Sequence, residues 1–538
     1  MPTLNWIGKD KVVNYHLKVP YHVLERKYSF DEKGQHEEDN GSENMIIHGD
    51  NLLALKSLLP KYEGKIKCIY IDPPYNTGNE GWVYNDNVND PRIKKWLGEV
   101  VGKEGEDLSR HDKWLCMMYP RLKLLQRLLS EDGVIFISID DNELFNLKDI
   151  CDDIFGKGNY LSLITRPTGT HTGIVNRAIV GEADYILVYA KILDKMSLDG
   201  LPLDEKDTKI YDMEDEQGRF LIRPLRRTGG ENRREDRPNM YFPIEAPDGT
   251  LVFPIGPTGY ESRWICNPDG YEKLKNEKRI YWKSIKDGEQ LKWQVYQKFY
   301  LKDKKKAVSN VWDEIEGNKK ATRDVREIFS DSAQKFDFPK PIGLIERIIQ
   351  MNATTSAIFL DSFAGSGTTA HAVLNQNQKD GGHRKFILIE MMDYADTITA
   401  ERVKRVISGY GDGKKAVPGT GGDFSYYELG QPLMKDGFLN EDVGEKAIRQ
   451  YVYFMDTKEN RPEEKAEEPY FLGKHLGTAY YFFYKKDEST TLDYKLLSAV
   501  RTKAESYVMY ADSCLLSQDE VMNYHITFKK IPRDIARL

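Results

Sequence analysis

A four-residue motif, Asp72-Pro73-Pro74-Tyr75, places a carboxylate and an aromatic ring on either side of two prolines. It follows residues 66–71, an apolar run continuous enough to form a strand that is buried on both faces. Because proline restricts its own backbone and that of the preceding residue, Asp72 and the neighbouring carbonyl groups should be held rigidly. A rigid carboxylate and carbonyl could accept hydrogen bonds from an exocyclic amine and prepare its nitrogen for attack.

The chemistry that suits this motif is methylation of the N6 amine of adenine. The lone pair of that amine is delocalised into the ring, so two acceptors would help the nitrogen to become tetrahedral and to attack the methyl group of a sulfonium in line. Tyr75 could stack on the base once the base has left a duplex. The simpler interpretation is a proline turn that only ends a strand, but the buried strand before it favours the chemical interpretation.

A second motif, DSFAGSG at residues 361–367, also follows an apolar run. Its two glycines let the backbone turn sharply and approach a ligand closely, although alone they often mark only a turn. No lysine follows as in a phosphate-binding loop, so a triphosphate is disfavoured. The next apolar run ends about 23 residues later in an acid that could accept hydrogen bonds from ribose hydroxyls, or could simply be exposed. The predicted cofactor-binding residues here are Asp361, Phe363, Gly365, Gly367 and Glu390.

Strands and helices are expected to alternate around both motifs. Leucines at helical spacing follow the apolar run 45–48, and residues 113–130 form an amphipathic pattern that ends before the apolar run 134–139. A further apolar run at 185–189 and a helical pattern at 342–351 continue the alternation. This rhythm predicts an α/β fold with a parallel sheet and helices on both faces. Both motifs lie at the carboxyl ends of strands, where such sheets bind ligands.

The alternation is lost in the middle of the chain, where Pro, Gly, Arg and aromatic residues punctuate short segments. This composition predicts an inserted domain of mixed α+β structure. The predicted parts are an N-terminal extension (1–44), a first half of the α/β domain (45–194), the insert (195–335), a second half (336–414) and a C-terminal extension (415–538). The aromatic segments of the last part must be buried in its own core, against the α/β domain, or in an interface.

The insert differs in charge from the rest of the chain. The net charge of the whole chain is −7, but residues 219–306 carry about 20 Lys and Arg against about 12 Asp and Glu, which leaves about −15 for the remainder. This asymmetry predicts that the insert binds the phosphates of double-stranded DNA, although a solvated surface would explain it as well. The arginines predicted to contact DNA are Arg223, Arg226, Arg227, Arg233, Arg234 and Arg237.

Composition disfavours several classes of protein. No run of eighteen apolar residues occurs, so no membrane span is expected. The first residues lack the apolar core of a signal peptide. The five cysteines are far apart and form no CxxC pair, which predicts a cytoplasmic protein with neither a metal site nor a disulfide framework.

The two motifs resemble the signatures of the amino-methyltransferase family of DNA modification enzymes, (Asp/Asn/Ser)-Pro-Pro-(Tyr/Phe) and Phe-x-Gly-x-Gly. The carboxylate motif comes about 290 residues before the glycine motif, an order similar to the circularly permuted β class. The resemblance implies a Rossmann-like fold, S-adenosylmethionine as cofactor and the insert as target recognition domain. It also implies that Asp50 and Asn51 contact the adenine of the cofactor and that the segment around Lys340 covers its methionine end.

A narrower resemblance is to the modification subunits of type III restriction systems. It rests on the segments DPPYNTGNE, KWLCMMYPRLKLLQRLLSEDGVIFISIDDNE, RPNMYFPI, FAGSGTTAHAVL and FKKIPRDI. Such subunits typically act as homodimers and recruit a separate helicase–nuclease for restriction, so both partners are expected here. An Asp at the first motif position favours adenine, and the resemblance implies methylation of adenine N6 in double-stranded DNA by base flipping and direct attack.

Three other functions are compatible with these patterns. A cytosine-N4 DNA methyltransferase would share the scaffold, although such enzymes more often carry Ser at the first motif position. A DNA-recognition subunit of a defence complex would have little activity alone, but the intact acid, prolines and glycines argue against decay. RNA and protein-glutamine methyltransferases use an Asn-Pro-Pro-Tyr motif, whereas the Asp and the long basic insert favour DNA.

Overall fold

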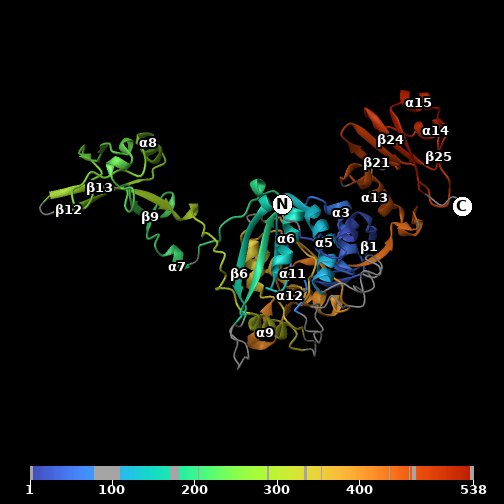
Figure 1. Ribbon diagram of the computed structural model, residues 1–538, viewed down its shortest axis with the longest axis horizontal. Helices are drawn as coiled ribbons and strands as arrows, with labels where there is room; N and C mark the ends of the chain where they lie inside the picture. Colours follow the sequence, from blue (N-terminus) through green and yellow to red (C-terminus); the bar gives the residue numbers. More distant parts are fainter. Residues whose placement is uncertain are drawn as a thin grey trace. The chain divides into compact units, whose positions relative to one another are not determined.

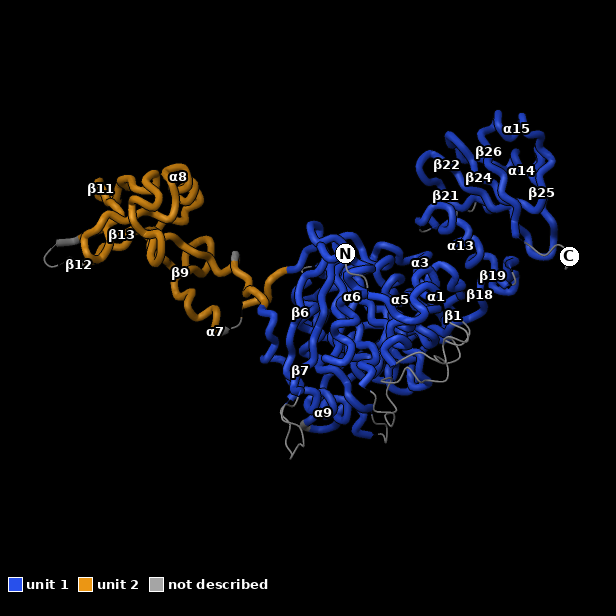
Figure 2. Tube along the Cα trace, viewed as in Figure 1, with its two compact units in different colours: residues 1–198, 309–538 blue, residues 199–308 orange. Residues whose placement is uncertain are grey.

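The protein is described by a computed structural model (Figure 1). The described residues are 4–77, 110–169, 181–203, 205–287, 290–331, 336–352, 354–435, 437–459, 461–462 and 468–532. They form two compact units: unit 1 comprises Met1–Leu198 and Ser309–Leu538, and unit 2 comprises Asp199–Val308 (Figure 2). Each unit has its own sheets and its own hydrophobic clusters.

Within the described residues, unit 1 is built on a ten-stranded sheet. Its strands, in spatial order, are β2 (Gly34–His36), β1 (His22–Asp31), β18 (Asp423–Pro432), β3 (Met45–His48), β15 (Lys385–Glu390), β14 (Ile358–Asp361), β4 (Ile66–Ile71), β5 (Leu129–Ile139), β7 (Ala183–Ala190) and β6 (Tyr160–Pro167). Every neighbouring pair from β18 to β5 is parallel, whereas β7 runs antiparallel to both neighbours. Burial of β4 and β15 along almost their whole length explains their continuous apolar sequences. The predicted α/β fold is confirmed.

Two groups of helices pack on this sheet. The first group is α3 (Asn51–Tyr62), α5 (Arg110–Leu128) and α6 (Leu144–Phe155), and the second is α10 (Ile342–Gln350), α11 (Thr368–Asp380) and α12 (Glu401–Ser408). The first group shares one hydrophobic cluster with alternate strand residues such as Ile69 and Ile71, while α11 packs against both α10 and α12. The chain steps from β4 to β5 in one direction along the sheet and from β14 to β15 in the other. Right-handed crossovers therefore place α5 and α11 on opposite faces.

Unit 2 has a small antiparallel sheet with the strand order β12-β13-β9-β8. Its main elements are β8 (Met213–Asp215), β9 (Gly218–Pro224), α8 (Pro268–Asn276), β12 (Ile280–Asp287) and β13 (Gln290–Tyr300). The unit is shorter than the insert expected at 195–335, because α9 (Asn318–Ile328) packs into unit 1. There Val325 and Ile328 share a cluster with Ile398.

Residues from both terminal extensions join the main sheet. β1 and β2 come from the first 44 residues, and β18 comes from the last part of the chain. Beyond β18, the chain forms a second sheet of β21 (Phe471–His475), β22 (Thr478–Phe482), β24 (Ser506–Ala511) and β26 (Ile526–Lys530), with α13 (Glu445–Thr457). Tyr453, Tyr481 and Phe482 are buried in clusters formed largely by this region itself. Its aromatic segments thus bury much of their surface within one chain.

Candidate functional site

The two motifs meet at the carboxyl ends of adjacent strands. β4 ends one residue before Asp72, β14 ends with Asp361, and the two strands pair in parallel. The crossovers leave β4 and β14 in opposite directions, which makes this the kind of switch point where open α/β sheets bind ligands. The fold thus brings together two motifs that are far apart in the sequence.

One oxygen of the Asp72 carboxylate is paired and the other is not. Oδ2 accepts a hydrogen bond from Nζ of Lys340 at 2.8 Å, whereas Oδ1 is buried and has no hydrogen-bond partner among the residues that the structure describes. Only 18% of the Asp72 side chain and 10% of the Lys340 side chain is exposed. Buried acceptors normally have partners, so Oδ1 marks a position where a donor from a ligand would fit.

Lys340 also lies over the ring of Tyr75, with Nζ 4.8 Å from the ring centroid. The Tyr75 hydroxyl lies 3.5 Å from Oδ2 of Asp184, to which Nη2 of Arg166 donates at 2.8 Å. Lys340 therefore occupies space beside both the carboxylate and the aromatic ring. A ligand that stacks on the ring face beneath Lys340 would have to displace this ammonium group, and a nearby anion would attract it away.

The glycine motif forms a tight loop between β14 and α11. Gly365 and Gly367 have φ angles of 52° and 79°, which glycine adopts without steric cost. The amide of Gly365 donates to Oε2 of Glu390 at 2.8 Å, and its carbonyl accepts from Oγ1 of Thr399 at 2.6 Å. A Cβ at Gly367 would lie 3.0 Å from the carbonyl oxygen of Thr399, so the loop has little room for a side chain there.

Two buried carboxyl groups shape this loop. Oδ1 of Asp361 accepts from the amide of Phe363 at 3.0 Å, and Oδ2 accepts from Oγ1 of Thr369 at 2.6 Å. Oε1 of Glu390 accepts from the amide of Met392 at 3.0 Å. Burial raises the pKa of both carboxyl groups to about 7. Both groups therefore titrate near neutral pH, and a ligand that bonds to the ionised form would favour loss of the proton.

Asn51 connects the turn after β3 to the glycine motif. Its Nδ2 donates to the carbonyl of Ser362 at 3.2 Å, and its Oδ1 accepts from Nε of Arg121 at 2.5 Å. Asp50 caps α3 by accepting from the amide of Leu52 at 2.9 Å. Sequence patterns alone do not identify Arg121. The one signal in the sequence is its charge within the amphipathic α5, because a charged side chain that is buried there requires polar partners such as Asn51.

The cavity between the two motifs is small. It has a volume of about 20 Å³, and Tyr70, Asp72, Phe338 and Lys340 lie in its wall together with the glycine loop. Pockets for small molecules typically measure about 300–1,000 Å³. A ligand of that size therefore fits between the motifs only if part of the cavity wall moves.

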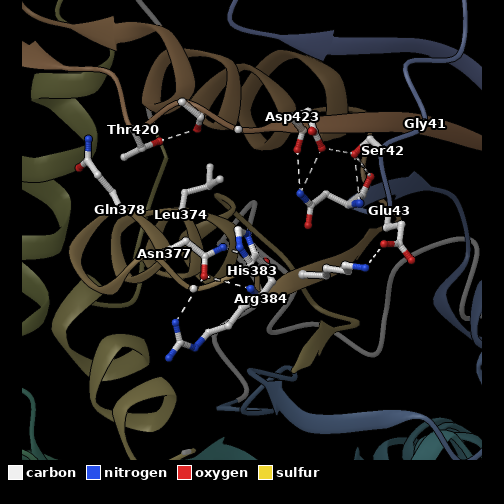
Figure 3. Close-up of a pocket in the computed structure, with 16 residues that line it drawn as sticks. Gly41, Ser42, Glu43, Leu374, Asn377, Gln378, His383, Arg384, Thr420 and Asp423 are labelled. Atoms are coloured by element: carbon white, nitrogen blue, oxygen red, sulfur yellow. Dashed lines mark hydrogen bonds and ion pairs between the residues drawn. The ribbon is translucent and has the colours of Figure 1, made fainter. Parts of the chain in front are cut away.

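A larger cavity, of about 460 Å³, lies at the opposite edge of the sheet (Figure 3). It is lined by residues at or near the amino-terminal ends of β3, β15 and β18 and by the second half of α11. The length of the strands separates it from the two motifs. Charged groups in its wall already have partners, for example Lys385 with Glu43 and Arg384 with Asp380. Its position away from the carboxyl ends of the strands excludes it as the place where the motifs act.

The six arginines assigned to DNA contact all belong to unit 2. Arg226 is partly exposed, and the exposed members are Arg223, Arg227, Arg233, Arg234 and Arg237. Arg234 pairs with Glu261 at 2.8 Å and lies over the ring of Tyr241. Exposed guanidinium groups retain donors that can bind phosphate oxygens, because each carries five N–H groups.

Neither a metal centre nor a membrane span is evident in the described parts of the chain. These residues contain no group of three or more His, Cys, Asp or Glu side chains that could hold a metal ion, and no helix among them is long and apolar enough to cross a membrane. Burial raises the pKa of the Cys68 and Cys151 thiols above its usual range, so neither is a thiolate at neutral pH.

Comparison with known proteins assigns the family. A family model for N6 and N4 methyltransferases, which is described as DNA methylase, matches residues 66–401. This range is more than half of the chain. The chain belongs to the DNA methylase family. In this methylase the matched range contains both the carboxylate motif and the glycine motif, with unit 2 between them.

The methylase is similar to proteins of two restriction-modification types. It is 36% identical over 422 residues to the EcoPI Mod subunit of a type III restriction-modification enzyme from Escherichia phage P1, which covers 72% of this chain and 63% of that protein. It is 34% identical over 367 residues to the type II methyltransferase M.KpnI from Klebsiella pneumoniae, which covers 65% of this chain and 81% of that protein. The chain thus spans less than two thirds of the EcoPI Mod subunit. The predicted resemblance to type III modification subunits is confirmed.

Among solved structures, a putative DNA modification methylase from Thermus thermophilus, complexed with S-adenosyl-L-methionine, matches 72% of this chain and 99% of its own, with 16% identity and a TM-score of 0.32.

Proposed function

We propose that this methylase transfers a methyl group from S-adenosylmethionine to the N6 amine of adenine in double-stranded DNA, as the modification component of a restriction-modification system. The observation that carries the proposal is the unsatisfied Oδ1 of Asp72, an acceptor at the switch point of the sheet and next to the strand that leads into the glycine loop. An Asp at this motif position favours adenine N6 over cytosine N4.

The residues around the glycine loop fit S-adenosylmethionine. Glu390 ends β15, where a carboxylate can accept hydrogen bonds from ribose hydroxyls. Lys340 is a cation in the wall of the same cavity and suits the methionine carboxylate, while Asp50 and Asn51 are assigned to the adenine end. When bound, S-adenosylmethionine supplies an electrophilic methyl group on its sulfonium.

The role of the protein in the reaction is to position and polarise the target amine. Oδ1 of Asp72 accepts one N–H of the amine and a backbone carbonyl of the motif accepts the other, which raises electron density on the nitrogen as it becomes tetrahedral. Tyr75 stacks on the extruded base. Lys340 must first leave Asp72 and the ring of Tyr75, and attraction to the carboxylate of the cofactor would move it, so the cofactor should bind before the base.

Transfer of tritium from labelled S-adenosylmethionine tests this function. The full chain is incubated with DNA from a methylation-deficient host, and with RNA and protein in parallel. Label should enter DNA alone, and digestion to nucleosides should locate it in N6-methyladenine. Label in RNA or protein, or no label with any acceptor, would contradict the proposal.

Target recognition is assigned to unit 2. Five of the six arginines assigned to DNA contact are exposed, and unit 2 is inserted between the two halves of the α/β domain. A homodimer and a helicase–nuclease partner stay predictions that rest on the similarity to type III Mod subunits. The aromatic segments of the C-terminal region give them no added support, because most of these side chains are buried within one chain.

Cofactor affinity should rise with pH. In the free protein the Glu390 carboxyl has a pKa of about 7 because it is buried, and ribose hydroxyls donate best to its ionised form. Binding below that pKa must release a proton, so S-adenosylmethionine should bind about ten-fold more weakly at about pH 6 than at about pH 8. Calorimetry in buffers of different ionisation enthalpy measures both the affinity and the proton released.

Two variants assign this pH dependence to one group. Glu390→Gln should bind the cofactor weakly at both pH values and lose the dependence. Asp140→Asn is the control: burial raises the pKa of Asp140 to about 6, but this carboxyl follows β5 and is assigned neither to the cofactor nor to the base, so the variant should keep the dependence. Equal wild-type affinities at the two pH values would show that Glu390 does not bind the ribose.

A further inference from the structure

The residues directly before and after Tyr75 are each anchored by a buried side chain. Nε1 of Trp114 donates to the carbonyl oxygen of Pro74 at 2.7 Å. On the other side, Nδ2 of Asn76 donates to the carboxylate of Glu143 and, at 3.2 Å, to a backbone carbonyl at the start of α5. The backbone that carries Tyr75 is therefore fixed at both ends, by α5 and by the turn before α6.

The first anchor, Trp114, is fully buried in α5. Its indole N–H satisfies a carbonyl that lies within the carboxylate motif, and Pro74 itself has no N–H with which to bind a neighbouring strand. Loss of this donor would leave a buried carbonyl oxygen unsatisfied and would free the motif to move.

The second anchor, Glu143, is a fully buried carboxylate. Besides Asn76, it accepts from Nδ1 of His111 at 2.6 Å and from Nδ2 of Asn146 at 2.8 Å. A buried carboxylate is costly unless hydrogen bonds satisfy it, so this network favours one arrangement of its donors. Asn76 is itself buried and has a φ of 58°, a left-handed conformation that residues other than glycine rarely adopt. The network fixes the point where the chain turns away from Tyr75.

We propose that Trp114 and Glu143 are positioning residues for methyl transfer, which hold Tyr75 in the geometry that an extruded base requires. They act through Pro74 and Asn76 and touch neither base nor cofactor. The proposal rests on the proposed function, because it requires a base bound at Tyr75. A displacement of the motif by about 1 Å would cost about 10²-fold in rate.

Trp114→Phe tests the first anchor, because it keeps a buried ring and removes the N–H. Trp312→Phe is the matched control: Trp312 is also fully buried, and its Nε1 donates to the carbonyl of Ser309 at 2.8 Å, outside both motifs. In the full chain with saturating DNA and cofactor, kcat should fall about 10- to 100-fold in Trp114→Phe and less than about three-fold in Trp312→Phe. The dissociation constant of S-adenosylmethionine should stay within about two-fold of the wild type in both variants.

Combination with Tyr75→Ala separates positioning from general stability. If Trp114 acts through Tyr75, Trp114→Phe should cost less than about two-fold once the ring is absent, because the two effects are coupled. Independent, multiplicative losses would overturn the proposal, and so would equal losses in Trp114→Phe and Trp312→Phe. A wild-type chain that methylates no DNA would instead overturn the proposed function.

Glu143→Gln tests the second anchor and gives an answer even if Trp114→Phe does not fold. The groups that bond to Glu143 are all donors. In the variant, the side-chain NH₂ of the new glutamine faces one of these donors, so kcat should fall about ten-fold. Adding Asn146→Asp gives the new NH₂ an acceptor where Asn146 donates in the wild type, and it keeps both hydrogen bonds of Asn76, so kcat should return to within about three-fold of the wild type. Glu131→Gln is the control, because Glu131 lies in β5 and 69% of its side chain is exposed; it should leave kcat unchanged. Failure of Asn146→Asp to restore activity would overturn this anchor.

Discussion

Asp72→Ala should reduce methyl transfer about 10³-fold while S-adenosylmethionine binds as tightly as to the wild type, or more tightly. The rate falls because the variant loses the unsatisfied acceptor Oδ1, and removal of one preorganised group in an active site typically costs about 10²–10³-fold. Affinity is retained because the variant also releases Lys340 from its 2.8 Å pair, so that this cation can bind the carboxylate of the cofactor. Tritium transfer and calorimetry measure the two quantities.

Two further variants show whether the loss of rate comes from the charge and the position of this carboxylate. Asp72→Asn keeps an acceptor oxygen without the charge and should fall between the wild type and Asp72→Ala. Asp141→Ala removes an exposed carboxylate just after β5 and should leave the rate unchanged. Near-normal turnover by Asp72→Ala would refute the mechanism, and loss of cofactor binding in that variant would assign Asp72 to the cofactor instead of the base.

Excision of unit 2 should weaken DNA binding by about 10²-fold or more and flatten its dependence on salt. The slope of log affinity against log salt reflects the number of phosphates that basic residues neutralise, and the assigned arginines all lie in this unit. The chain enters and leaves the unit at one point, where Leu201 and Lys306 form backbone hydrogen bonds of 2.9 and 2.8 Å. A short Gly-Ser linker can therefore replace Asp199–Val308, and fluorescence anisotropy at several salt concentrations measures the effect.

The protein that lacks unit 2 must be shown to fold, and point substitutions must show which residues of unit 2 bind DNA. Unchanged affinity for S-adenosylmethionine shows that unit 1 is intact. Replacement of the six arginines of unit 2 by glutamine should reproduce much of the loss, whereas replacement of exposed lysines of unit 1, such as Lys18, Lys33 and Lys65, should change affinity little. DNA binding with an unaltered salt slope after excision would place recognition outside unit 2.

The strands that carry chemistry could be predicted because their signal is local. A buried parallel strand needs a continuous apolar run, and a polar or glycine-rich motif marks its carboxyl end, as at Asp72 and Asp361. The topology of such sheets then requires the two ends to meet if the strands are neighbours. Both motifs and the α/β class therefore followed from the sequence, while the order of the strands did not.

Contacts between distant residues could not be predicted in this way. Lys340 and Asp72 are 268 positions apart, and neither a charge pattern nor a periodicity links them. Glu143 lies in a polar turn whose composition gives no sign that its carboxylate is buried beside Asn76. β1 and β18 mix polar and apolar residues, and only their pairing with each other and with β3 places them in the sheet.

Modification-sensitive sequencing of DNA from cells that express this chain tests the central claim most directly. We predict N6-methyladenine at one recurring sequence, and no such modification in cells that lack the chain or that express Asp72→Ala. N4-methylcytosine at the recurring sequence, or unmodified DNA in cells that contain the folded wild-type chain, would contradict adenine methylation by this protein.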